Sequence, residues 1–193
     1  MKQAVLCLVL LLAAAGAASA KNDNHPGDRG DQGHGLPVIL SFDTMYGVDG
    51  PLLGETNAIR GVIGDEAPWA IAHFIQGRLG TSGRLQILVR GLVFKDDPLV
   101  DPGLVGKNDE PFYRGLVSCL TEDAQGGISP ANVVTGGFTA SVDGNSFIDE
   151  TLVLPNPCIA PIVFVMAGSE DKWFAVTGFE SASGSSDGSK HHH

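Results

Sequence analysis

The chain is poor in basic residues. Its 193 residues include 12 Lys and Arg against 22 Asp and Glu, which gives a net charge of −10. Nucleic acids and anionic membranes are bound by clustered Lys and Arg, so we expect neither as a partner. The acidic balance does not identify a positively charged partner, because a solvated acidic surface also keeps an ordinary protein in solution.

Long apolar runs are missing after the first twenty residues. Residues 1–20 are typical of a secretory signal peptide: Lys2 is the charged start, Ala4–Ala18 is apolar, and Ala18-Ser19-Ala20 fits the cleavage pattern. The apolar run is shorter than the roughly 18–20 residues that span a bilayer. We therefore expect cleavage after Ala20, no membrane span in the mature chain, and a location outside the cell or in its envelope.

Cysteine is scarce as well. Cys7 lies in the expected signal peptide, and its removal leaves Cys119 and Cys158. Exported proteins meet oxidising conditions, so these two cysteines are expected to form a disulfide, although two free buried thiols are the alternative. The bond would close a loop of about 39 residues and stabilise the fold by about 4 kcal/mol through chain entropy. Neither cysteine belongs to a Cys-x-x-Cys pair, which argues against redox chemistry.

Both ends of the mature chain lack the apolar residues needed to fold. Residues 21–35 (KNDNHPGDRGDQGHG) are polar and Gly-rich, which is typical of a flexible leader. Residues 181–193 (SASGSSDGSKHHH) have the composition of a Ser/Gly linker with terminal histidines. One folded domain is therefore expected over residues 36–180.

Side-chain alternation, rather than helical periodicity, dominates this domain. A β-hairpin is predicted over residues 69–94, with Thr81-Ser82-Gly83 as its turn. Further strands are expected at 112–121, 133–142, 147–154, 158–167 and 173–179, with Asp143-Gly144 as a tight turn. The 158–167 run is apolar on both faces and should lie centrally, and Pro161 implies a bulge or an edge there. The pattern predicts an all-β fold: a single antiparallel β-sandwich, immunoglobulin-like or jelly-roll-like, with one disulfide.

One connection is unusually long. Lys95–Pro111 contains 17 residues without a clear period, and loops of this length are often functional. It carries five carboxylates, the ligand type that calcium prefers, although their spacing matches no defined calcium loop. These candidate metal ligands are Asp96, Asp97, Asp101, Asp109 and Glu110. A solvated acidic loop is the alternative, and no other cofactor is expected.

No set of residues amounts to a catalytic site. His73 is the only histidine in residues 36–180, and by parity it falls on the apolar face with Ile71 and Ile75, as a core or rim histidine would. A catalytic histidine needs a nucleophile and an orienting carboxylate, which sequence neither supplies nor excludes. Four charged residues interrupt apolar strands and are interpreted as structural ion pairs or solvent-facing groups: Arg60, Arg90, Arg114 and Glu150.

Some motif matches are explained by their setting. Gly184–Gly188 fits G-x-S-x-G but lies in the expected tail, with no strand or helix to hold the serine. The carboxylate and amide side chains of Asp143, Asn145 and Asp149 begin like a calcium-binding EF-hand loop. Phe147 and Ile148, however, stand where that motif needs a ligand and a glycine.

The hairpin GRLGTSGRLQILVRGL, residues 77–92, resembles hairpins of secreted β-sandwich domains of the CHRD type. Paired histidines would follow such a strand, and Phe94-Lys95-Asp96-Asp97 stands there instead. The resemblance covers under a fifth of the domain and implies no function.

The sequence therefore predicts a secreted β-sandwich domain, a non-enzymatic module that binds an extracellular partner or plays a structural part. A flat or grooved surface with exposed aromatic residues and no polar cleft would mark such a module. The alternative is an extracellular hydrolase or a calcium-stabilised domain that uses the acidic 95–111 loop, in which His73 and the loop carboxylates should converge.

Overall fold

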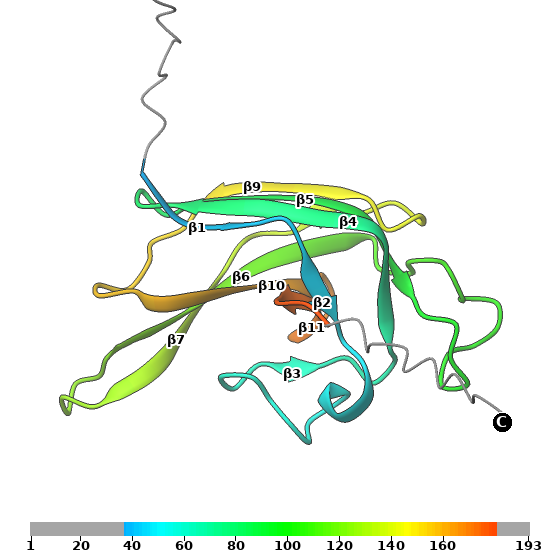
Figure 1. Ribbon diagram of the computed structural model, residues 1–193, viewed down its shortest axis with the longest axis horizontal. Coiled ribbons are helices and arrows are strands. Elements are labelled where there is room, and N and C mark those ends of the chain that lie inside the picture. The colour runs from blue at the N-terminus through cyan, green and yellow to red at the C-terminus, as the bar shows by residue number, and fades with distance from the viewer. Residues whose placement is uncertain (1–36, 181–193) are drawn as a thin grey trace, which may run out of the picture. The chain divides into compact units, whose positions relative to one another are not determined.

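The computed structural model describes residues 37–180, and the expected signal peptide, leader and tail lie outside this range. Two antiparallel sheets pack against each other, which confirms the predicted sandwich (Figure 1). The first sheet has the strand order β1-β4-β5-β9. The second has the order β2-β11-β10-β6-β7, with β3 added beside β11 and β8 beside β6. The strands are β1 (Val38–Phe42), β2 (Met45–Gly47), β3 (Ile63–Gly64), β4 (Trp69–Gly80), β5 (Arg84–Phe94), β6 (Phe112–Glu122), β7 (Ile128–Val134), β8 (Phe138–Thr139), β9 (Ser146–Thr151), β10 (Ile159–Ala167) and β11 (Lys172–Thr177).

The core lies between the two sheets. Alternate residues of β4 and β5, such as Ile75 and Ile87, point inward and are fully buried. Val117 and Val163, which pair across β6 and β10, face them from the second sheet. Gly115 marks how closely the sheets approach, because a Cβ atom there would lie 2.8 Å from a methyl carbon of Leu85.

A connecting segment, residues 48–64, covers the outer side of the second sheet. It contains the 3₁₀ turn η1 (Gly50–Leu52) and β3, and it runs below β10 and β11 in Figure 1. Arg60 anchors it by donating a hydrogen bond of 2.9 Å to the carbonyl of Ser118 on β6. Beneath this cover, Phe164, Met166 and Trp173 are at most 2% exposed.

The disulfide joins the strand of Cys119 to the residue that precedes β10. The Cys119 and Cys158 Cα atoms lie 4.9 Å apart and the sulfurs are bonded. Immediately after it, Ile159 pairs with Leu120 of β6. The predicted disulfide is confirmed.

Several predicted elements are confirmed. The β4–β5 hairpin has its turn at residues 81–83, and β10 lies between β11 and β6 at the centre of its sheet. The register of β10 shifts between Ile159 and Ile162, as expected around Pro161. No helix in the described part of the chain is long and apolar enough to cross a membrane.

Two expectations about strands are wrong. The single strand expected over 133–142 is two strands, β7 and β8, because the regular pairing with β6 is interrupted at Thr135-Gly136-Gly137, where the register shifts by one residue. Arg60 does not interrupt a strand: it lies in the connecting segment with a φ of 52°. The short strands β1, β2 and β3 were not predicted, since they are too short to establish a period.

Candidate functional site

The outward side of the first sheet is exposed to solvent. Residues that alternate with the buried core positions of β4, β5 and β9 point away from the second sheet. We call this surface the open face, and its residues are Phe74, Gln76, Arg78, Arg84, Gln86, Leu88, Arg90, Phe147 and Asp149. Two aromatic rings on it remain in contact with water, because Phe74 is 42% exposed and Phe147 is 53% exposed.

A shallow groove of about 440 Å³ lies across the open face. It extends from β1 to β9, and the strand register explains its lining. Gln76 pairs with Leu88, and Leu88 pairs with Phe147, so these three side chains form one row across β4, β5 and β9. The residues that line the groove are Ser41, Phe42, Gln76, Gly77, Arg78, Gln86, Leu88 and Phe147.

The next row across the sheet is polar. Arg78 Nε donates to Gln86 Oε1 at 2.8 Å, and Gln86 Nε2 donates to Asp149 Oδ2 at 3.0 Å. Arg84 donates two hydrogen bonds, of 2.9 and 2.7 Å, to the same carboxylate. These bonds from Arg84 lower the pKa of Asp149 to about 2. The row is therefore held in one arrangement by interactions across three strands.

The open face carries a local positive charge. The guanidinium of Arg84 neutralises Asp149, the one acidic residue of this surface. Arg78 contributes only Nε to its hydrogen bond, and Arg90 has no hydrogen-bond or ion-pair partner within residues 37–180. Two guanidinium groups are thus available to an external ligand, although the chain as a whole has a charge of −10.

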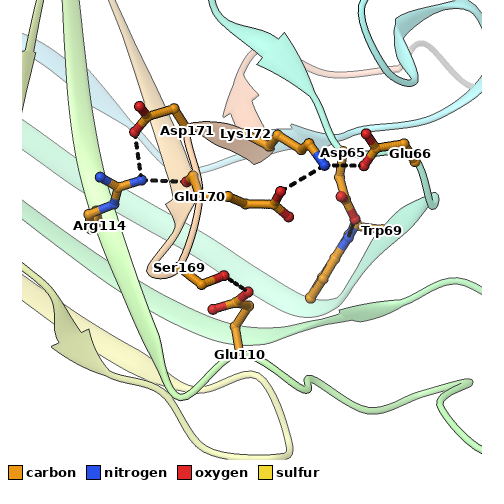
Figure 2. Close-up of polar contacts among 9 residues, drawn as sticks. All are labelled: Asp65, Glu66, Trp69, Glu110, Arg114, Ser169, Glu170, Asp171 and Lys172. Carbon is orange, nitrogen blue, oxygen red and sulfur yellow. Dashed lines mark hydrogen bonds and ion pairs between the residues drawn. The ribbon is translucent and has the colours of Figure 1, made fainter.

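A second polar cluster lies at the edge of the second sheet (Figure 2). One carboxylate oxygen from each of Asp65, Glu66 and Glu170 lies within 4.8 Å of the others. The ammonium of Lys172 stands between two of them, bonded to Glu66 and, at 2.7 Å, to Glu170. These hydrogen bonds raise the pKa of Lys172 and lower that of Glu66. The ammonium of Lys172 therefore already pairs with two of the three carboxylates, and the geometry is that of a structural ion pair.

Asp65 is the buried member of this cluster. It is 8% exposed, and its Oδ2 accepts a hydrogen bond of 2.6 Å from the indole of Trp69. Burial raises the pKa of Asp65. The indole also stacks on Phe174 at a ring separation of 3.8 Å, so Asp65 positions an aromatic core residue where β4 begins.

The charged strand residues have structural contacts. Arg114 Nε donates to the carbonyl of Ala167 at 2.7 Å. Its Nη2 donates to the backbone carbonyl of Glu170 and to the carboxylate of Asp171, in the turn between β10 and β11 (Figure 2). Glu150 accepts a hydrogen bond of 2.9 Å from the backbone of Gly136. Arg90 differs from these residues because it points to solvent.

The long connection joins β5 to β6, as expected, but two of its carboxylates close local turns. Asp97 accepts from the backbone of Leu99 at 2.9 Å, and Asp101 accepts from that of Gly103 at 2.7 Å. Glu110 bonds to the hydroxyl of Ser169 (Figure 2). Burial raises the pKa of Asp109, and Asp96 is exposed.

Within the described range, no three of these loop carboxylates bring ligand atoms within 4.8 Å of one another. Calcium binding by this loop stays a prediction.

The expectation that His73 lies on the core face is wrong. His73 is exposed, because the register of β4 against β5 shifts between Ile71 and Phe74. At this bulge Gly91 adopts a φ of 72°, and a Cβ atom there would lie 2.9 Å from the His73 ring. The inserted residue takes His73 out of the alternation, although Ile71 and Ile75 on either side of the bulge both face the core. His73 makes no hydrogen bond to a carboxylate or nucleophile among residues 37–180.

Sequence reasoning missed the open face. The signal was present as the polar half of the alternation in β4 and β5, where Gln76, Arg78 and Gln86 alternate with core residues. Their connection to Phe147 and Asp149 depends on β9 pairing with β5 in a particular register. That pairing brings together residues more than 60 positions apart.

Comparison of this chain with protein-family models, curated proteins and solved structures gives no match.

Proposed function

We propose that this protein is an exported, non-enzymatic binding module that engages an extracellular partner through the open face. The observation that carries the proposal is the groove of about 440 Å³, in which Phe147 is 53% exposed beside a fixed row of polar side chains. Exposed aromatic side chains next to oriented polar groups are typical of binding surfaces. The side chains of the open face can contact a partner, and the proposal assigns no reaction to them.

The scaffold supports this role. The polar row is held by hydrogen bonds that cross β4, β5 and β9, so little side-chain order has to be created when a partner arrives. The inward residues of the same strands are fully buried, which fixes the position of the strands. Export rests on the small-x-small pattern at Ala18-Ser19-Ala20, and the disulfide of Cys119 and Cys158 fits an oxidising compartment.

The proposal is tested with a labelled domain, residues 21–180, added to the surface of the cells that export it. Replacement of both exposed rings, Phe74→Ser with Phe147→Ser, should weaken saturable binding by about tenfold or more, because buried aromatic anchors dominate interface energies. The matched control is Phe179→Ser, which removes a ring that is 72% exposed outside the open face. It should bind like the wild type.

Equal binding by the double variant and the control would overturn the proposal. Export is tested separately: the chain recovered from the medium or envelope should begin at Lys21, as determined by N-terminal mass spectrometry. Recovery of an uncleaved cytosolic chain would contradict it.

A further inference from the structure

Resting on the proposed function, we infer that the ligand of the open face is an acidic polysaccharide, a chain of sugar units that bear carboxylates. Charge gives the first argument. Arg78 and Arg90 offer guanidinium groups on a face whose one carboxylate, that of Asp149, is already paired with Arg84. A guanidinium binds a carboxylate through two parallel hydrogen bonds, which makes it selective for anions of this shape.

The spacing of these two arginines favours an extended ligand. Arg78 pairs with Gln86, and Arg90 lies four residues further along β5. At about 3.3 Å per residue the two positions are roughly 13 Å apart. A chain with repeated carboxylates can contact both guanidinium groups at this backbone spacing.

The surface between the arginines suits sugar rings. Leu88 and Phe147 form an apolar floor, and the amide of Gln76 lies in the same row. A sugar ring has an apolar C–H side and a rim of hydroxyl groups. The first can lie on the Leu88 and Phe147 side chains, and the second can bond to the Gln76 amide and the Ser41 hydroxyl at the end of the groove.

A polypeptide suits this surface less well. Extended peptides bind sheets by adding a strand at an edge, where backbone groups are unpaired. The groove instead crosses the face of the sheet, over β4 and β5, whose backbones already pair on both sides. A second copy of the chain is also disfavoured, because two open faces that meet would both carry the unneutralised positive charges of Arg78 and Arg90, which repel each other.

The inference is tested by calorimetric binding of the 21–180 domain to three defined polymers. Polygalacturonate should bind. Its methyl ester, which has the same sugars without the charge, should bind at least about tenfold more weakly. Poly-L-glutamate, which has the charge without the sugars, should not bind measurably. Binding of polygalacturonate should weaken as salt is raised, because the charges are exposed.

Variants locate the site. Arg78→Gln with Arg90→Gln should weaken polygalacturonate binding by about tenfold or more, and Phe147→Ser should do so separately. Lys107→Gln is the matched control, since it removes an exposed positive charge in the long connection. It should leave binding unchanged. Unaltered thermal unfolding of each variant shows that the fold is intact.

The outcomes separate the two proposals. Poly-L-glutamate binding as tightly as polygalacturonate would overturn the polysaccharide and indicate an acidic protein partner. Equal binding of the methyl ester would overturn charge recognition. Cell-surface binding that depends on Phe74 and Phe147, without binding to polygalacturonate, would overturn this inference and leave the binding module standing. If substitutions on the open face changed neither cell-surface binding nor polygalacturonate binding, both the binding module and the polysaccharide inference would be overturned.

Discussion

The two sheets of this sandwich differ in how many of their faces are covered. In the second sheet, β10 contains five consecutive buried residues, Val163–Ala167, because the first sheet covers one side and the 48–64 segment covers the other. In the first sheet, β4 alternates between buried residues such as Ile75 and exposed residues such as Gln76. Side chains on the free face of the first sheet can contact a partner, whereas the Val163–Ala167 side chains on both faces of β10 are buried in packing.

The same contrast appears in two carboxylates. Asp65, at the edge of the second sheet, has its pKa raised by burial. Asp149, on the open face, has its pKa lowered to about 2 by hydrogen bonds from Arg84. Burial removes water from the first carboxylate, while the second keeps its solvent and gains a cation.

The largest expected effect compares phenylalanines from the two sheets. Phe164→Ala on β10 should lower the free energy of unfolding by about 3–5 kcal/mol, because it leaves a cavity in a fully buried layer. Phe147→Ala on the open face should change it by no more than about 0.5 kcal/mol. Urea unfolding of both variants measures the difference. Similar losses would show that the open face is packed against something in solution.

Loss of the disulfide should come next. The double variant Cys119→Ala with Cys158→Ala should lose about 2–4 kcal/mol of stability, because the bond restrains a 39-residue loop in the unfolded chain. Reduced wild type should unfold at the same urea concentration as the double variant. Since the bond lies in the second sheet, binding through the open face should persist below the unfolding midpoint. An unchanged midpoint would contradict this expectation.

A smaller, pH-dependent effect is expected at Asp65. Its folded-state pKa is raised, so the folded protein holds this proton more tightly than the unfolded chain. Its contribution to stability is greatest below the unfolded pKa of about 4 and falls as pH rises through the folded pKa. Asp65→Asn should remove this fall. Urea midpoints from pH 4 to 8 should therefore diverge in favour of the variant, and parallel profiles would refute the assignment.

The smallest effect has the opposite sign and concerns Asp149. Its folded pKa of about 2 is below the unfolded value, so its stabilising contribution is present above about pH 4 and is lost as pH falls toward 2. As pH falls from about 4 to 2, the free energy of unfolding should therefore decrease less in the Asp149→Asn variant than in the wild type. The loss is modest because the pair with Arg84 is exposed. NMR titration of the wild type should place this carboxyl pKa near 2, and a value near 4 would contradict the polar row.

The sequence predicted the parts of the fold that depend on local period and composition. The turn at residues 81–83, the central β10 and the irregularity at Pro161 could be predicted because each has a short-range physical cause. The position of His73 could not, because it lies in a bulge opposite Gly91 that takes it out of the alternation, while Trp69 and Ile75 on either side face the core as expected. The outward row of Gln86 and Asp149 needed the pairing of β9 with β5, which no local pattern encodes.

The sequence by itself determined the class of the fold: alternation imposes strands, and Cys119 and Cys158, the two cysteines within residues 37–180, permit one pairing. Tertiary structure alone decided which sheet is covered twice and which keeps a free face, because this depends on where the 48–64 segment packs. It also decided that Phe147 and Arg78 lie on one surface. Strand register, a long-range choice made by the whole core, places them there.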